Sequence, residues 1–194
     1  MASRLASVLG DERSALSVVS DARMAQLTSL PPASERGIPT APAVIYDTAF
    51  LDSLPPASGD AQWECLAEAL YFEARGESVR GQFAVGEVIL NRVESAAYPQ
   101  SLCGVVKQGT GRKYACQFSY NCDGNPKVVH EQDAWDRVGK IAAILLEGAS
   151  RDLTGGATHF HTRAVNPSWS RSYTRTTEIG AHLFYRAPVR TAAN

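Results

Sequence analysis

Apolar residues recur at helical spacing over much of residues 60–147. Over residues 60–75, five of them fall on one side of an expected helix: Trp63, Leu66, Ala67, Leu70 and Ala74. Residues 78–95 carry apolar side chains around so much of the circumference that this second helix is expected to be central. A third long helix is expected over residues 131–147, apolar on one side and ended by Gly148.

Shorter elements are expected between and after these helices. A short helix is predicted over residues 101–107, and a glycine-rich loop over residues 108–125. Residues 157–162 alternate in the way that is typical of a strand, and a further short strand or helix is expected over residues 178–185. The pattern therefore predicts an α+β fold that is mostly α, with a small β portion.

The beginning of the chain differs in composition from the rest. Residues 1–59 are rich in Ala, Ser and Pro, and only residues 15–27 suit a short helix, without a strong stripe. We expect residues 1–59 to be an N-terminal arm or linker, partly disordered, and residues 31–59 to be a linker or an extended arm wrapped on the domain. Residues 44–46 suit local docking. One main domain is expected over residues 60–187, followed by a tail over residues 188–194.

Composition and charge narrow the classes of function. The chain has 194 residues, of which 44% are hydrophobic and 20% are charged, which is typical of one ordinary globular domain. A net charge of −1 argues against nucleic acid as the main partner. No apolar run is long enough to span a bilayer, and no basic segment followed by an apolar one opens the chain as an export signal would.

Four cysteines indicate the compartment: Cys65, Cys103, Cys116 and Cys122. An even count suits two disulfides, which are typical of proteins outside the cytoplasm. A zinc site is disfavoured because no CxxC pair is present, whereas free buried thiols stay possible. Of the three possible pairings we favour Cys116–Cys122, which closes a short loop, together with Cys65–Cys103, which joins two expected helix starts.

Glu73 falls three residues after Leu70, on the apolar stripe of the first long helix. Burial of a carboxyl raises its pKa, and a carboxyl that stays protonated near neutral pH is what a general acid needs. The competing interpretation is a solvated glutamate or a simple ion pair with Arg75, Arg80 or Arg92. From spacing alone both interpretations remain open.

Two further carboxylates are candidates for a second catalytic group. Glu77 lies four residues after Glu73 and so faces almost the same way, which suits an acid–base or acid–nucleophile pair. It also precedes the second helix, where an acid favours the helix dipole, and we weigh this structural role slightly higher. Asp123, in the glycine-rich loop, is the second candidate. Glu87, inside the second helix, is ambiguous.

Residues that suit sugar binding gather in the loop before the third long helix. Polar side chains beside an aromatic ring can combine hydrogen bonds with stacking on a sugar. The candidates in this loop are Gln117, Phe118, Ser119 and Tyr120, and Tyr114, Trp169 and Tyr173 are similar candidates.

His159 and His161 lie two apart in the alternating segment, so both are expected on one face of a strand. Together with His182 and Glu73 they could ligate zinc, which would indicate an amidase. We expect them instead to line a groove or brace the strand, and we expect no metal or other cofactor. A cysteine protease using Cys116 is disfavoured because the cysteines fit disulfides better.

Several blocks of sequence occur in order from about Cys65 to Arg186. They read YFEARGE (71–77), GQFAVG (81–86), VILNRV (88–93), YP (98–99), CGVV (103–106), QFS (117–119), GATHF (156–160) and IGAHLFY (179–185). Together they resemble the SleB/CwlJ cell-wall hydrolase family. The resemblance implies a lysozyme-like catalytic domain over residues 60–187 that cleaves peptidoglycan glycan strands. It also implies that Glu73, the first glutamate of EARGE, is the catalytic residue.

The resemblance leads to an expected reaction between N-acetylmuramic acid and N-acetylglucosamine. Glu73 would protonate the glycosidic oxygen, and the muramic 6-hydroxyl would then attack C1, giving the 1,6-anhydro product of a lytic transglycosylase. If Glu77 or Asp123 positions a water, the outcome is that of a muramidase. Two different classes of function also remain open at this point, a zinc-dependent N-acetylmuramoyl-L-alanine amidase and a non-catalytic wall-binding domain. We expect peptidoglycan as the partner and a periplasmic or extracellular location.

Overall fold

The structure is a computed structural model that describes residues 44–112 and 115–188. The expected features of residues 1–43, Tyr114 and the end of the tail lie outside these described residues. In the described part the elements, in chain order, are α3 (Thr48–Ser53), α4 (Ala61–Ala74), α5 (Val79–Glu94), α6 (Leu102–Val106), the 3-10 turn η1 (Ser119–Asn121), α7 (Gln132–Leu146), β1 (His159–Thr162), the 3-10 turn η2 (Ser168–Arg171), β2 (Thr174–Ile179) and β3 (His182–Arg186). The α+β class with a small β portion is confirmed.

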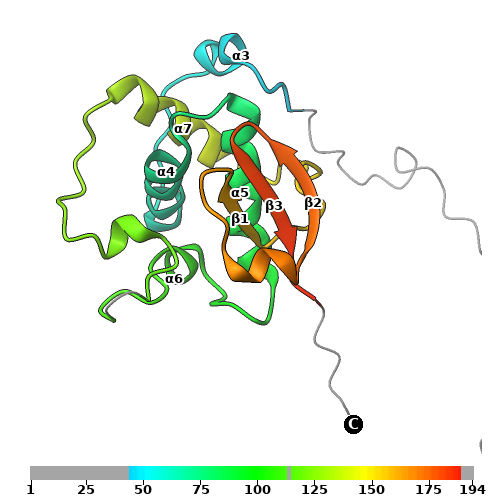
Figure 1. The fold of residues 1–194 in the computed structure, drawn as a ribbon. Coiled ribbons are helices and arrows are strands. Elements are labelled where there is room, and N and C mark those ends of the chain that lie inside the picture. Colours follow the sequence, from blue (N-terminus) through cyan, green and yellow to red (C-terminus); the bar gives the residue numbers. More distant parts are fainter. Residues whose placement is uncertain (1–43, 113–114, 189–194) are drawn as a thin grey trace, which may run out of the picture. The chain divides into compact units, whose positions relative to one another are not determined.

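The helices begin where short polar side chains can cap them. Asp60 accepts hydrogen bonds from the backbone N–H groups of Gln62 and Trp63 at the start of α4, at 2.9 and 3.1 Å. Ser78 does the same for α5 through the N–H of Gly81 at 3.2 Å. Almost all of α5 is buried up to Ile89, and Figure 1 shows α5 with α4 and α7 on one side and the sheet on the other. Its predicted central place is confirmed.

A three-stranded antiparallel sheet in the order β1-β3-β2 packs on this helical layer. The prediction of one strand or helix over residues 178–185 was wrong. This segment contains the end of β2, the turn that follows it and most of β3. Gly180, at φ +60°, makes the turn between β2 and β3. Strand β2 gave little signal because Ile179 is its only buried residue, so no alternation of apolar and polar residues marks it.

The segment before α4 folds onto the domain and contains a short helix that the sequence pattern did not predict. Asp47 caps α3 by accepting a hydrogen bond from the N–H of Phe50 at 2.7 Å. Leu51 is completely buried, and the Lys140 ammonium on α7 donates to its carbonyl at 2.9 Å. Tyr46 packs edge-on against Phe83 of α5 with ring centroids 5.2 Å apart. The local docking expected of residues 44–46 is therefore found, but the linker or extended arm has a helical turn.

Both predicted disulfides are present. Cys65–Cys103 joins α4 to α6, and Cys116–Cys122 closes the loop that contains η1. The first bridge therefore holds α6 against α4, and the second constrains the loop that follows α6. Within residues 44–112 and 115–188, no helix combines the length and the apolar character that a membrane span requires.

Candidate active site

Glu73 lies in the last turn of α4 and is half-buried, as its place on the stripe predicts. Leu66 and Leu70, on the same stripe, are completely buried. Loss of solvent raises the pKa of the Glu73 carboxyl to about 7, and the positive charge of Arg92 opposes part of this rise. At neutral pH about half of the molecules thus carry a protonated Glu73 carboxyl, which is the form that a proton donor needs.

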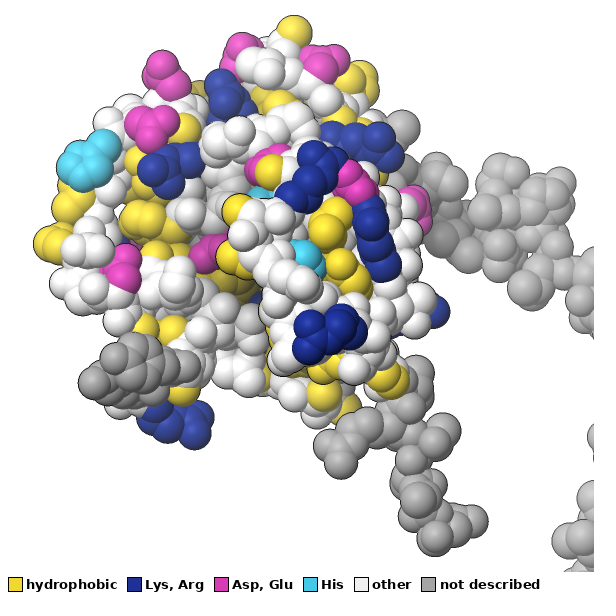
Figure 2. All heavy atoms as spheres, in the orientation of Figure 1, with side chains coloured by type: hydrophobic (Ala, Val, Ile, Leu, Met, Phe, Trp, Pro, Cys, Tyr) yellow, Lys and Arg dark blue, Asp and Glu magenta, His cyan; other side chains and the backbone are white. Residues whose placement is uncertain are grey.

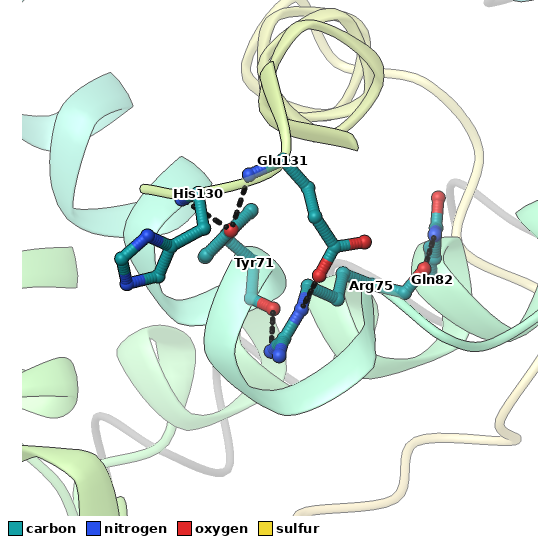
Figure 3. Close-up of polar contacts among 5 residues, drawn as sticks. All are labelled: Tyr71, Arg75, Gln82, His130 and Glu131. Atoms are coloured by element: carbon teal, nitrogen blue, oxygen red, sulfur yellow. Dashed lines mark hydrogen bonds and ion pairs between the residues drawn. The ribbon is translucent and has the colours of Figure 1, made fainter. Parts of the chain in front are cut away.

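The end of α4 is held from two sides, as Figure 3 shows. The Tyr71 hydroxyl accepts hydrogen bonds from the backbone N–H groups of His130 and Glu131, each at 3.1 Å. Arg75 forms an ion pair with Glu131 at 2.8 Å, so it does not serve as the partner of Glu73 that the sequence allowed. The Gln82 side chain on α5 donates to the Arg75 carbonyl at 3.2 Å. The turn that carries Glu73 is therefore fixed against both neighbouring helices.

Arg92 of α5 supplies a buried positive charge to the site. Its Nε donates to the Thr158 carbonyl at 2.6 Å. Its guanidinium lies over the rings of Tyr98 and Phe118, 5.6 and 5.5 Å from their centroids. Burial lowers the pKa of Arg92, while nearby Tyr98 and Glu73 oppose this change. A buried cation held by the Thr158 carbonyl is thus close enough to Glu73 to favour its carboxylate form.

The loop closed by Cys116–Cys122 forms the wall beside Glu73. Tyr120 is buried and stacks on Phe72 of α4 with ring centroids 4.6 Å apart. Burial, with the charges of Glu68 and Glu73, raises the pKa of the Tyr120 hydroxyl, so Tyr120 stays neutral. Phe118 is also buried, whereas Gln117 and Ser119 are exposed. Of the predicted sugar-binding residues in this loop, Gln117 and Ser119 are therefore the ones open to a substrate.

His159 on β1 lies close enough to Arg92 to feel its positive charge. Its ring nitrogens face the Thr158 hydroxyl at 3.1 Å and the Tyr98 hydroxyl at 3.5 Å. Burial, aided by the positive charge of Arg92, lowers the pKa of His159 to about 4. His159 is therefore neutral at physiological pH and can donate or accept a hydrogen bond without adding charge.

The side chain of His161 contacts neighbouring residues of the sheet. Its ring stacks on Tyr185 with centroids 5.2 Å apart, and its Nε2 lies 3.1 Å from the Tyr185 hydroxyl. Its Nδ1 lies 2.8 Å from the Thr162 carbonyl. In the part of the chain that the structure describes, no three His, Cys, Asp or Glu side chains are grouped as metal ligands would be.

Glu77 braces the β2–β3 turn. Its Oε2 accepts a hydrogen bond from the Ala181 N–H at 3.2 Å, and its Oε1 lies 3.3 Å from Nδ1 of His182, without the alignment of a hydrogen bond. Burial lowers the pKa of His182, and the charge of Glu77 opposes this effect. Asp123 is fully exposed and accepts from the Asn125 N–H at 2.9 Å, which lowers the pKa of its carboxyl. Each of the two carboxylates thus has a local partner.

Sequence reasoning missed the central place of Arg92, which it considered only as one possible ion-pair partner. The signal was available, because Arg92 lies seven residues after Val85 and four after Val88, on the buried face of α5. Glu87 was left as ambiguous and is structural. Its buried carboxylate accepts hydrogen bonds from two backbone N–H groups, at 3.0 Å each, and from the Thr154 hydroxyl at 2.5 Å.

A hollow in the described residues is a separate feature from this site. It has a volume of about 590 Å³ and is lined by residues 54–58, by Val44 and Phe50, and by residues of and just after α7. None of the side chains around Glu73 and Arg92 belongs to it. Lys140 and Glu147 are the ionisable side chains in its lining, which is otherwise mostly apolar.

Comparison with known proteins decides the family. The family model described as Cell Wall Hydrolase matches residues 76–185. The chain belongs to the cell wall hydrolase family. Glu73 lies three residues before the matched range, so the family model does not cover this residue.

Relatives of this cell wall hydrolase include two curated spore cortex-lytic enzymes. One, from Halalkalibacterium halodurans, is 31% identical over 133 residues, which cover 68% of this chain and 37% of that protein. The other, from Bacillus cereus, is 31% identical over 122 residues, which cover 62% of this chain and 42% of that protein. The chain therefore spans about two fifths of the length of the curated relatives that it matches.

Solved structures share the fold of this cell wall hydrolase. The catalytic domain of the germination-specific lytic transglycosylase SleB from Bacillus anthracis is 28% identical, with a TM-score of 0.54, and the alignment covers 69% of this chain and all of that domain. The catalytic domain of the Bacillus cereus SleB protein is also 28% identical, with a TM-score of 0.51, and 95% of it is covered. The predicted family and fold are confirmed.

Proposed function

We propose that the chain cleaves peptidoglycan glycan strands between N-acetylmuramic acid and N-acetylglucosamine, with Glu73 as the general acid. The observation that carries this proposal is the half-buried Glu73 carboxyl, whose pKa is raised to about 7 at the rigid end of α4. Membership of the cell wall hydrolase family and similarity to a domain named as a lytic transglycosylase support it.

The reaction uses one carboxyl in two steps. Protonated Glu73 donates its proton to the glycosidic oxygen as the bond from C1 to that oxygen breaks, and positive charge develops on the muramic ring. The muramic 6-hydroxyl then attacks C1, and the Glu73 carboxylate takes the proton of this hydroxyl. The product carries a 1,6-anhydro-muramic end and the enzyme returns to its starting state. Between the two steps Arg92 stabilises the carboxylate electrostatically.

The transglycosylase outcome is favoured over hydrolysis by the positions of Glu77 and Asp123. Glu77 is held by Ala181 at the β2–β3 turn, and Asp123 is exposed and bound to Asn125. Without a second carboxylate opposite Glu73, the hydroxyl of the substrate is the available nucleophile, and the sugar ring holds it close to C1. A muramidase that uses Glu77 or Asp123 is the competing outcome.

We further propose that the protein works in the cell envelope, in the periplasm or outside the cell. Its substrate would lie there, and the two disulfides suit an oxidising compartment.

Replacement of Glu73 tests the proposed function. Glu73→Gln keeps the size of the side chain but removes the proton, so activity on purified peptidoglycan should fall about 100-fold or more. Glu64→Gln, at an exposed position on the same helix, is the matched control and should keep activity. Mass spectrometry of the wild-type digest should show 1,6-anhydro-muramic ends.

Two results would contradict parts of this proposal. A Glu73→Gln enzyme within a few-fold of wild type would remove Glu73 from the chemistry. Products that take up oxygen from labelled water and are reducible by borohydride would show hydrolysis and direct attention to Glu77 and Asp123.

A further inference from the structure

Charge is distributed unevenly over the described chain. Residues 159–188 contain four arginines and one glutamate, whereas the described residues before them contain more acidic than basic side chains. Figure 2 shows the consequence as a group of Lys and Arg side chains over β2 and β3. A chain of net charge −1 therefore presents one distinctly positive face.

Three arginines of this face are available to a ligand. Arg163 and Arg175 share the single carboxylate of Glu178, and their side chains are 60% and 49% exposed. Arg171 in η2 is exposed, and within residues 44–112 and 115–188 it has no ion-pair partner. Two positive charges on one negative charge, with a further cation nearby, leave an excess that suits an anionic ligand.

An aromatic cluster lies among these arginines. The half-buried ring of Trp169 contacts four other rings, with centroids 5.1 to 5.5 Å away: His159, His161, Tyr173 and Tyr185. Arg171 follows Trp169 by two residues in η2. A partly exposed indole, in the same 3-10 turn as an exposed arginine, offers stacking for a sugar or peptide together with a donor for carboxylates.

This face adjoins the candidate active site through β1. His159 contacts Trp169, and the neighbouring Thr158 carbonyl accepts the hydrogen bond from Arg92, whose charge acts on Glu73. A polymer that has one sugar at Glu73 can therefore extend over η2 and the sheet.

We infer that the arginine surface, formed by Arg163, Arg171 and Arg175 with Trp169, binds the carboxylates of the stem peptides that hang from the glycan strand. This inference rests on the proposed function and names a substrate class for it, namely strands that carry peptides. The amino sugars of a bare strand are uncharged apart from the muramic lactyl group, whereas each stem peptide adds carboxylates. Guanidinium groups recognise carboxylates with charge-assisted hydrogen bonds.

Binding to two matched substrates tests the inference. The protein is the full chain with Glu73→Gln, so that strands are bound without being cut. The probes are soluble, uncross-linked glycan strands with their stem peptides, and the same strands after an amidase has removed the peptides. We expect the peptide-bearing strands to bind about tenfold more tightly, and expect added salt to reduce this ratio because exposed charges are screened.

Variants then locate the effect. Arg171→Gln should reduce the ratio roughly threefold, and the double variant Arg163→Gln, Arg175→Gln should reduce it at least as much. Arg112→Gln removes an exposed arginine outside this surface and should leave the ratio unchanged. Thermal unfolding of each variant verifies that it is folded.

The outcomes separate this inference from the proposed function. Equal affinity for both strands, with cleavage by the wild-type chain intact, overturns the inference alone. An Arg112→Gln variant that loses as much as Arg171→Gln overturns it as well, since the effect would then be one of net charge. Failure to bind either strand, together with no cleavage by the wild type, would overturn the proposed function.

Discussion

Partial burial of Glu73 raises the pKa of its carboxyl, which affects both the stability of the fold and the proposed reaction. Its half-buried side chain loses hydration, and the buried Arg92 compensates only part of that loss, so the carboxyl holds its proton up to about pH 7. In the unfolded chain the same group loses its proton near its ordinary pKa of 4.5. The folded state therefore binds more protons than the unfolded state between these two values.

This difference predicts how stability depends on pH. The free energy of unfolding of the wild-type protein should fall as pH rises from 4.5 to about 7, by roughly 1–3 kcal/mol from this group alone. Glu73→Gln lacks the group, so its stability relative to wild type should increase over that window and level off above it. Denaturant unfolding at pH 4.5, 6 and 8 measures this, with Glu64→Gln as the control. A stability difference that is constant over pH would show that Glu73 is well solvated.

At this scale the sequence was informative about Glu73 and less so about its surroundings. The position of a side chain on a helical stripe follows from spacing within one helix, which is a local property. The neighbours of Glu73 come from α5, from the Cys116–Cys122 loop and from β1, and they meet only because the chain folds. Pattern alone could not place Phe118 and Tyr120 inside the wall, since the conformation of their loop depends on tertiary contacts.

Among the elements, the β2–β3 hairpin depends on a single glycine. Gly180 has φ +60°, and a Cβ at this position would lie 2.0 Å from the Glu77 carboxylate that holds the turn. Gly156 has φ +75° with nothing nearby. Gly156→Ala should therefore cost only the backbone strain, about 1 kcal/mol, whereas Gly180→Ala should cost about 2–3 kcal/mol because Glu77 must also move. Thermal or denaturant unfolding compares them, and equal costs would show that Glu77 moves aside freely.

The two disulfides should differ in their effect on stability. Cys65–Cys103 spans 38 residues and Cys116–Cys122 spans 6. Because a bridge limits the unfolded chain more when its loop is longer, replacing the first pair by serine should cost about 4 kcal/mol and the second about 2 kcal/mol. Removing the shorter bridge should nevertheless reduce activity more at a temperature where both variants are folded, since it frees the wall beside Glu73. The opposite order of activity would mean that η1 keeps its place without the bridge.

The elements that the sequence predicted are those with strong local signals. Capping residues mark the starts of α4 and α5, apolar stripes mark α4, α5 and α7, and each of these helices was predicted to within a residue or two at its ends. Strand β2 and helix α3 were missed because each buries a single side chain, Ile179 and Leu51 respectively. Such elements are formed by what they pack against, and one residue makes no periodic pattern.

At the scale of the whole molecule, we propose that the folded unit includes residues 44–59, which precede the domain start expected at residue 60. Leu51 is completely buried between α3 and the helical layer. Leu51→Ala should therefore lower the free energy of unfolding by about 2–4 kcal/mol, as for a core leucine. Ile45→Ala, at a position that is 52% exposed, is the control and should have little effect. If both substitutions were neutral in denaturant unfolding, the segment before α4 would be an appendage of a unit that folds without it.

The place of Trp169 has an optical consequence. Trp63 and Trp135 pack against each other with ring centroids 6.2 Å apart, whereas the half-buried Trp169 lies on the sheet face among two histidines and exposed arginines. An indole in such surroundings changes its emission when a ligand displaces water or when a neighbouring imidazole gains a proton. Positive charges nearby also concentrate iodide, an anionic quencher, over caesium, a cationic one. Trp169 is therefore an intrinsic fluorescent reporter of ligands that bind to this face, and no attached dye is needed.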